Sequence, residues 1–182
     1  MPADITLKVI IGGEASVGKT TLLKRFVEGF FVEDTQMTIG VQIHKKTLEI
    51  NDTISCDLQL WDLGGQERFR TFLDSFVRGS KGALLLFDLT RRKTIERIDH
   101  WVDIIRKFDP TLPILLIGSK YDLIDMVCVA KDDIETLMEK HNFIDYMHTS
   151  AKSGLNVELA FQTLTSHLLQ KENIREKLGI EV

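Results

Sequence analysis

The chain has 182 residues, of which 43% are hydrophobic, and its 23 Lys and Arg against 27 Asp and Glu give a formal net charge of −4. This length suits one domain with a single core, and the slightly acidic balance argues against a protein that binds nucleic acid by neutralising phosphates. Two cysteines, Cys56 and Cys128, are too few for a disulfide framework and indicate a reducing compartment. No apolar run approaches the roughly 18 residues of a membrane span, so we expect a cytoplasmic protein.

Short apolar runs alternate with segments of helical periodicity, which is typical of an α/β sheet covered on both faces. The pattern predicts strands at 7–12, 41–50, 54–62, 83–87, 114–118 and 143–148. Only Asn51-Asp52-Thr53 separates the second strand from the third, so these two are expected to form an antiparallel hairpin.

Helices are predicted at 19–28 and between Thr94 and Pro110, from a capping box of Asp132 and Glu135 to about 141, and from a cap at Asn156 through Leu168. The fold class is therefore α/β, with a six-stranded, mostly parallel sheet that contains one antiparallel strand and is flanked by about five helices.

The segment Gly13-Glu14-Ala15-Ser16-Val17-Gly18-Lys19-Thr20 matches the phosphate-binding loop G-x-x-x-x-G-K-[ST] and lies between a predicted strand and a predicted helix. Its glycines let the backbone curl so that N–H groups face phosphate oxygens, and the helix N-terminus adds partial positive charge. Lys19 would reach the β- and γ-phosphates, and the Thr20 hydroxyl is placed to ligate Mg²⁺. The loop alone does not distinguish ATPases, kinases and GTPases.

A second polar segment, Asp62-Leu63-Gly64-Gly65-Gln66-Glu67, begins where the third predicted strand ends. Asp62 could hold a metal-bound water, and Gly65 would let a backbone N–H approach the γ-phosphate. Gln66 is neutral and carries both a donor and an acceptor, which suits the orientation of an attacking water. Taken alone, however, Asp-x-x-Gly is a common turn.

Ser119-Lys120-Tyr121-Asp122 and Thr149-Ser150-Ala151-Lys152 each follow a predicted strand, at the carboxyl edge where open α/β sheets bind ligands. The Asp122 carboxylate can accept two hydrogen bonds from N1–H and N2–H₂ of guanine, which adenine cannot offer. The stem of Lys120 can lie over the base. These two segments therefore favour a guanine nucleotide.

In this order and context, the motifs resemble those of the small GTPases of the Ras superfamily, over about 7–169. The resemblance is strongest to the Rab branch, through Thr38-Ile39-Gly40-Val41, Trp61-Asp62, Gln66-Glu67-Arg68-Phe69-Arg70-Thr71 and Arg78-Gly79, whereas Leu63-Gly64-Gly65 resembles the Arf branch. It implies a P-loop NTPase fold of the Ras-like G-domain type, with a core at about 6–170 and a C-terminal helix and tail at 171–182. It also implies a GTP/GDP switch that slowly hydrolyses GTP.

The resemblance also implies roles for individual residues. Thr38 would ligate Mg²⁺ through its hydroxyl and sense the γ-phosphate, Phe31 would lie against the guanine, and the Ala151 N–H would reach guanine O6. The implied catalytic residues are Gln66, Lys19 and Thr38, and the implied metal site consists of Thr20, Thr38 and, through water, Asp62. The implied nucleotide-binding set is Gly13, Ala15, Ser16, Val17, Gly18, Lys19, Thr20, Thr21, Phe31, Thr38, Gly65, Ser119, Lys120, Asp122, Ser150, Ala151 and Lys152.

Ile43, Trp61 and Phe76 fall at the apolar triad with which Rab proteins contact effectors. Effectors, exchange factors and GTPase-activating proteins are therefore expected at the switches, and the chain is expected to be a monomer without a nucleic-acid partner. No cysteine follows Cys128, so prenylation is not expected, and membrane contact would go through a partner or a missing tail.

Three positions depart from the family pattern. Ser119 stands where the family usually has Asn, whose amide ties the base loop to the phosphate loop, so we expect at least one hydrogen bond between these loops to be missing or water-mediated. Ala15 and Ser16 stand where Ras proteins have glycines, and a methyl group at Ala15 would crowd an incoming arginine finger.

The sequence leaves two alternatives open. One is a nucleotide-bound interaction scaffold with little or no turnover, which Ala15 favours and which Gln66, Thr38 and Asp62 oppose. The other is a P-loop kinase of small substrates, which Asp122 and the Ser150-Ala151-Lys152 segment oppose.

Overall fold

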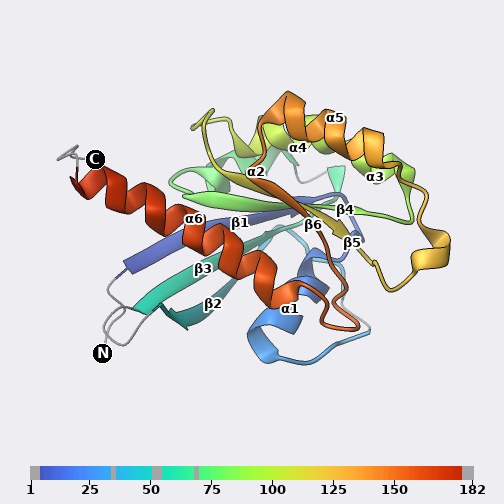
Figure 1. The fold of residues 1–182 in the computed structure, drawn as a ribbon, viewed down its shortest axis with the longest axis horizontal. Coiled ribbons are helices and arrows are strands. Elements are labelled where there is room, and N and C mark those ends of the chain that lie inside the picture. The colour runs from blue at the N-terminus through green and yellow to red at the C-terminus, as the bar shows by residue number, and fades with distance from the viewer. Residues whose placement is uncertain (1–4, 34–35, 51–54, 68–69, 178–182) are drawn as a thin grey trace.

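A sheet with the strand order β2-β3-β1-β4-β5-β6 runs through the centre of the protein (Figure 1). The computed structural model describes residues 5–33, 36–50, 55–67 and 70–177. The turn predicted at 51–53, residues 68–69 of the Rab-like run at 66–71 and the tail from 178 lie outside these residues. The strands are β1 (Ile5–Gly13), β2 (Val41–Glu49), β3 (Ser55–Leu63), β4 (Gly82–Asp88), β5 (Ile114–Ser119) and β6 (Asp145–His148).

The strand pairing confirms the predicted fold class. β2 runs antiparallel to β3, with Ile43 opposite Trp61, while the β1–β3, β1–β4, β4–β5 and β5–β6 pairs are parallel. β4 and β5 are buried along their whole length, as their uninterrupted apolar runs require in a sheet that is covered on both faces.

Two layers of helices cover the sheet (Figure 1). On one face lie α1 (Lys19–Glu28) and α6 (Val157–Lys177), which share a core with alternate residues of β1, β4 and β5. On the other face lie α2 (Arg70–Val77), the single turn α3 (Arg92–Ile95), α4 (Ile98–Ile105) and α5 (Lys131–His141). A short 3₁₀ helix, η2 (Ile124–Met126), follows β5. Five of these helices have eight or more residues, as predicted, but the sequence analysis assigned no helix at α2.

The helix predicted at 19–28 is confirmed, but the one predicted between 94 and 110 is divided into α3 and α4 by a turn at 96–97. Ile95 and Ile98 are both buried, so the apolar stripe exists although the helix is broken. Phe108, which falls within the predicted helix and was expected on its apolar stripe with Ile95 and Ile98, lies beyond the end of α4 and is 45% exposed, with the Arg78 guanidinium 4.7 Å from its ring centre. Periodicity finds the buried face of a helix but does not show where the helix stops.

The predicted capping box at the start of α5 is wrong. The helix begins at Lys131, before Asp132, and the carboxylate that accepts a hydrogen bond from the backbone N–H of Ala130, at 3.3 Å, belongs to Asp133 and not to Glu135. Asp133 also pairs with Arg92 across the interface with α3, so a tertiary contact accompanies the choice of this carboxylate.

The cap predicted at Asn156 is also wrong in detail. Asn156 has a φ of 55°, and its side-chain amide donates a hydrogen bond to the His148 carbonyl at 2.9 Å, whereas an N-cap side chain accepts one from its helix. The last strand starts at Asp145 and not at 143. Phe143 precedes β6, and its apolar side chain is buried in the core without being part of the strand.

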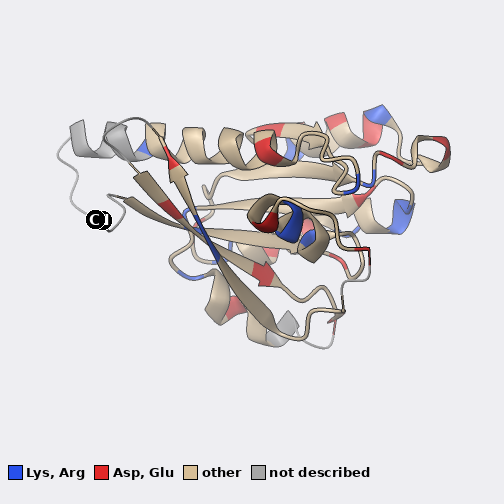
Figure 2. Ribbon diagram, turned by 90° about the horizontal axis from the view of Figure 1, so that it is seen from below, with Lys and Arg blue, Asp and Glu red and all other residues tan. Residues whose placement is uncertain are grey.

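Charges of both signs are interspersed along the elements seen in Figure 2. β2 carries Lys45 and Lys46 side by side, and Lys45 pairs with Asp57 on β3 at 2.6 Å. None of the helices in the described part of the chain combines the length and the apolar character needed to cross a membrane.

The two helices on the α1–α6 face meet through stacked aromatic rings, and this contact yields a stability prediction. The rings of Phe26 and Phe161 have centroids 3.8 Å apart and are inclined by 7°, and both side chains are buried. We expect Phe161→Ala to lower the free energy of unfolding by about 3–5 kcal/mol, since it leaves a cavity in this layer. Urea unfolding would measure the loss, with Leu159→Ala, an exposed position on the same helix, as the control. An equal effect of the two substitutions would contradict the prediction.

Candidate functional site

A cavity of about 490 Å³ opens beside the phosphate-binding loop and draws its walls from five separate segments of the chain. Of the residues predicted for the site, it is lined by Ala15, Ser16, Gly18, Lys19, Thr20, Thr21, Phe31, Thr38, Gly65, Gln66, Ser119, Lys120, Asp122, Ala151 and Lys152. The remaining four, Gly13, Val17, Asp62 and Ser150, do not line it. The structure therefore brings the predicted motifs to one place.

Six lining residues were missed by the sequence analysis: Leu22, Glu33, Gln36, Met37, Leu123 and Thr149. Leu22, Met37, Leu123 and Thr149 lie directly next to residues that were assigned, while Glu33 and Gln36 lie two positions away. Adjacency to a motif could have pointed to the first four, whereas Glu33 and Gln36 carry no such signal.

The phosphate-binding loop has the curled backbone that its sequence predicts. Gly13 has a φ of +137°, and a Cβ at that position would lie 2.3 Å from the Leu86 carbonyl oxygen, so only glycine fits. Lys19 is 5% exposed, and its Nζ donates hydrogen bonds to the carbonyls of Gly13 and Glu14, both at 2.7 Å. A cation is thus held inside the loop whose N–H groups suit an anion.

Side-chain oxygen atoms cluster around Asp62, the residue that was predicted to hold a metal-bound water. The hydroxyls of Thr20 and Thr38 are 2.7 Å apart, and they donate hydrogen bonds to Asp62 Oδ2 at 2.5 and 3.3 Å, respectively. Asp62 is fully buried, and its Oδ1 has no hydrogen-bond partner among the described residues.

The environment of Asp62 is unfavourable for a carboxylate without a cation. Burial raises the pKa of Asp62, against the opposing effects of the Thr20 hydrogen bond, the Lys19 charge and the Thr38 hydrogen bond. Hydroxyl and carboxylate oxygens are the ligands that hard divalent cations take, and the orphaned Oδ1 offers a further acceptor. These residues therefore fit Mg²⁺.

The segment after β3 contacts both the phosphate-binding loop and residues 36–40. A Cβ on Gly65 would lie 2.4 Å from the Ala15 nitrogen, so glycine is required for this close approach. The Gly64 N–H donates to the Gly40 carbonyl at 2.7 Å, and Gln66 Nε2 lies 3.7 Å from the Met37 sulfur. Gln66 thus lines the cavity where the two predicted switch segments meet.

The loops after β5 and β6 are tied to each other. Ser150 is buried, and its hydroxyl donates to Asp122 Oδ1 at 2.7 Å, while the Tyr121 N–H donates to the Thr149 carbonyl at 3.0 Å. Ser150 thus orients a carboxylate at the cavity, although it does not line the cavity itself. This geometry suits an acceptor for the N–H groups of a guanine.

The Ser119 hydroxyl reaches the phosphate-binding loop directly, so one hydrogen bond between the two loops is made, while the loss of a further bond relative to Asn stays a prediction. Ser119 Oγ lies 2.5 Å from the Val17 carbonyl oxygen and 2.9 Å from that of Phe87, and the residue is buried. A single hydroxyl hydrogen serves one of these carbonyls at a time. The short side chain suffices since Val17 approaches it closely, which the sequence does not reveal.

The predicted apolar triad is assembled at the surface. Ile43 is 58% exposed and lies opposite Trp61 in the β2–β3 register, and the rings of Trp61 and Phe76 are 6.1 Å apart. The Lys8 ammonium lies 3.9 Å from the centre of the Trp61 ring. Trp61 and Phe76 are half-buried against the core. The triad therefore combines one exposed aliphatic side chain with two aromatic rings that pack on the core.

Comparisons with known proteins agree with this site. The sequence profile of the Ras family matches residues 8–170. The mouse Ras-related protein Rab-19 is 39% identical over 172 residues, which cover 94% of this chain and 79% of that protein. The Ras-related protein RABA4b of Arabidopsis thaliana is 38% identical over 171 residues, which cover 93% of this chain and 75% of that protein. The chain belongs to the Ras family, and it is a Rab-like small GTPase, a GTP/GDP switch that hydrolyses GTP. This membership excludes the kinase alternative.

The contact between Ser119 and the phosphate-binding loop gives a prediction for nucleotide release. Ser119→Ala leaves the Val17 carbonyl without this donor, at a cost of about 1–3 kcal/mol. We therefore expect GDP and GTP to dissociate roughly tenfold faster. Preference for guanine over adenine should not change, as Asp122 is untouched. Release of a fluorescent GDP would measure the effect.

Ser80→Ala is a matched control, since Ser80 is also buried and also donates its hydroxyl to a carbonyl, that of Val77, but lies outside the cavity lining. Equal release rates for wild-type protein and Ser119→Ala would show that the contact does not hold the loop.

Proposed function

We propose that this chain is a Mg²⁺-dependent molecular switch in membrane trafficking, with the cavity as its guanine-nucleotide site. The observation that carries the proposal is the group of buried Asp62 and Thr38 with half-buried Thr20. This group has an orphaned carboxylate oxygen and lies beside a phosphate-binding loop whose cavity Asp122 also lines. Such a site offers acceptors to a cation, donors to phosphates and an acceptor to guanine at three points of one cavity.

The phosphates would lie in the loop from Gly13 to Thr20. Lys19, which is already held at the carbonyls of the loop, would supply a full positive charge to the β- and γ-phosphates. The backbone N–H groups at 15–18 and the N-terminus of α1 would add partial charges, and Thr21 lines the same wall.

The base would be recognised by the loops after β5 and β6. Asp122, oriented by Ser150, would accept the guanine N1–H and N2–H₂, and the Ala151 N–H would donate to O6. The stem of Lys120 and the ring of Phe31 line the cavity and would pack on the base, while Lys152 lies at its rim.

Mg²⁺ would be held by Thr20 and Thr38 and, through water, by Asp62. When bound, the ion would neutralise charge on the phosphates. The hydroxyls that now donate to Asp62 would turn their lone pairs to the cation, which requires only a rotation of each O–H.

Gln66 would orient the water that attacks the γ-phosphate. It lines the cavity next to Gly65, whose backbone lies against the phosphate-binding loop, and its amide offers both a donor and an acceptor. Lys19 and the N–H groups of the loop would stabilise the charge of a loose transition state.

Loss of the γ-phosphate would remove contacts from Thr38 and Gly65 and so release both switches. Effectors would read this change at Ile43, Trp61 and Phe76, which lie on β2, β3 and α2, since Ile43 is opposite Trp61 in the register and the rings of Trp61 and Phe76 are 6.1 Å apart. We place this activity in the cytoplasm, with membrane contact through partner proteins.

One experiment tests the assignment of site and reaction: identify the nucleotide that co-purifies with the protein, and measure single-turnover hydrolysis of GTP. We expect Gln66→Leu to lower the hydrolysis rate by roughly 100-fold and to leave GTP affinity nearly unchanged, because the contact forms chiefly in the transition state. Gln59→Leu, an exposed position on β3, is the control. Hydrolysis by Gln66→Leu at the wild-type rate would refute the water-orienting role, and a co-purified adenine nucleotide would refute the role of Asp122.

Removal of the acid tests the metal site. Asp62→Asn is expected to weaken Mg²⁺ binding to the nucleotide-loaded protein by about 10–100-fold, as for other residues that act on a metal through an intervening group. EDTA should accelerate nucleotide release from wild-type protein much more than from this variant. Asp103→Asn, an exposed position on α4, should behave as wild type. Unaltered Mg²⁺ affinity in Asp62→Asn would place the metal elsewhere.

A further inference from the structure

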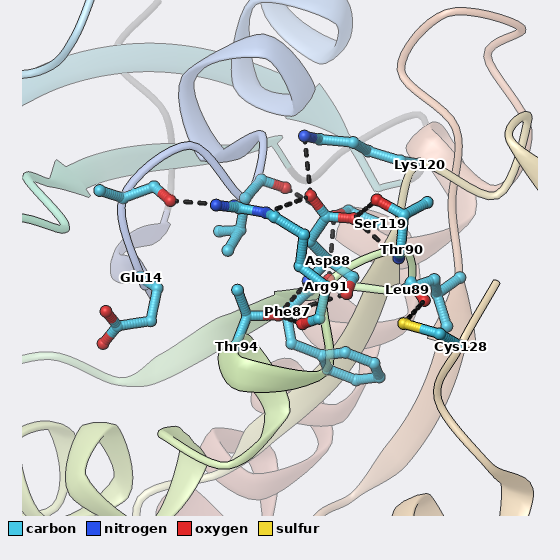
Figure 3. Close-up of polar contacts among 12 residues, drawn as sticks. Glu14, Phe87, Asp88, Leu89, Thr90, Arg91, Thr94, Ser119, Lys120 and Cys128 are labelled. Carbon is cyan, nitrogen blue, oxygen red and sulfur yellow. Dashed lines mark hydrogen bonds and ion pairs between the residues drawn. The ribbon is translucent and has the colours of Figure 1, made fainter. Parts of the chain in front are cut away.

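A second fully buried carboxylate, Asp88, ends β4 and contacts groups from two segments, the residues directly after it and the loop after β5 (Figure 3). Its Oδ1 accepts hydrogen bonds from the backbone N–H and the hydroxyl of Thr90, at 2.9 and 2.7 Å. Its Oδ2 accepts from Arg91 Nε and pairs with Lys120 Nζ, both at 2.8 Å. Burial alone would raise the pKa of Asp88, but the hydrogen bonds from Lys120, Thr90 and Arg91 outweigh it and hold that pKa below its ordinary value.

The backbone around Arg91 is fixed by a short turn. The Arg91 N–H donates to the Asp88 carbonyl at 3.0 Å, and the Thr94 hydroxyl donates to the Arg91 carbonyl at 2.7 Å. The same Thr94 oxygen accepts from the Asp88 N–H at 2.9 Å, and Thr94 is buried. The arginine side chain therefore starts from a fixed point beside the carboxylate.

The Arg91 guanidinium bridges two parts of the molecule. While its Nε donates to Asp88, its Nη2 donates to the carbonyl oxygen of Ala15, at the tip of the phosphate-binding loop, at 3.0 Å (Figure 3). The planar fork of arginine can serve both acceptors at once, whereas the single ammonium of lysine cannot match this geometry.

The contact with Ala15 also sets the direction of an N–H group. The Ala15 carbonyl and the Ser16 N–H belong to one planar trans peptide and point in opposite directions, so anchoring one orients the other. Ser119 acts in the same way two residues on, because its hydroxyl holds the Val17 carbonyl and thereby orients the Gly18 N–H. Alternate peptides of the loop are thus held from the side of β4 and β5.

We propose that Arg91 is a positioning residue for the nucleotide: anchored on Asp88, it holds the Ala15–Ser16 peptide in the orientation that presents an N–H to phosphate, and so slows nucleotide release. The inference rests on the proposed function of the cavity. Asp88 also holds Lys120 of the base loop, so one buried carboxylate fixes a residue from each side of the site. Arg91 acts on the loop and not on the base, so GDP and GTP are affected alike.

The test compares Arg91→Ala, Arg91→Lys and Arg92→Ala for release of fluorescent GDP and of a non-hydrolysable GTP analogue in the presence of Mg²⁺. Arg92 is the matched control, since its guanidinium pairs with Asp133 and Glu96, away from the loop. We expect Arg91→Ala to release both nucleotides about tenfold faster, with guanine preference unchanged, and Arg92→Ala to behave as wild type.

Arg91→Lys separates positioning from simple pairing with Asp88. It retains a cation beside the carboxylate, so the loaded protein should unfold near the wild-type temperature, yet release should stay as fast as in Arg91→Ala, because the fork is lost. In amide spectra of the GDP-loaded protein, the Ser16 N–H signal should move and exchange faster in both Arg91 variants, but not in Arg92→Ala.

Wild-type release by Arg91→Ala, or full recovery of wild-type release by Arg91→Lys, would overturn the inference. These outcomes leave the proposed function standing, because the wild-type protein still binds guanine nucleotide in both. Failure of the wild-type protein to bind GDP or GTP would instead refute the proposed function, and the inference with it.

Discussion

The parallel alignment of β1, β3, β4 and β5 is the constraint on which the site depends. The register places Ile11 of β1 beside Asp62 of β3, and Gly13 beside Leu86 of β4, while Asp88 lies beside Ser119. Each strand therefore ends at the same edge, and each end is followed by a segment that carries polar groups. The helices complete the hydrophobic cores on both faces of the sheet and so fix the positions of the strands that end at this edge.

The two buried acids at this edge have opposite electrostatic settings. Asp88 meets the cationic side chains of Arg91 and Lys120 within the protein, and its pKa is lowered. Asp62 accepts hydrogen bonds from the hydroxyls of Thr20 and Thr38 and has the Lys19 charge nearby, but burial dominates and its pKa is raised. A buried carboxylate that is already paired with cationic side chains holds parts of the fold together. A buried carboxylate without such a direct pair is suited to binding a cation. The contrast distinguishes an acid whose charge is met within the protein from the acid proposed for the metal site.

Much of the fold and most of the site could be predicted from sequence because each signal is local. The phosphate-binding loop is a contiguous run of residues, the helix at 19–28 has its periodicity intact, and the hairpin follows from a connection too short for a parallel crossover. The errors share a cause. Phe108, the carboxylate that caps α5, and Asn156 were each placed by local pattern, and each is decided by a neighbour that is distant in sequence or by where a helix ends.

By itself, the sequence determined the class of fold, the phosphate-binding loop and the choice of guanine over other bases, since these depend on residue types at fixed short spacings. Only the tertiary structure decided how the loop is held. Ser119 meets Val17 across 102 positions and Arg91 meets Ala15 across 76. No spacing rule foresees such contacts, because they arise from strands that are adjacent in the sheet and remote in the chain. The buried carboxylate that organises them, Asp88, looks in sequence like an ordinary end of a strand, and it becomes informative only when its four hydrogen-bonding and charged contacts are seen together.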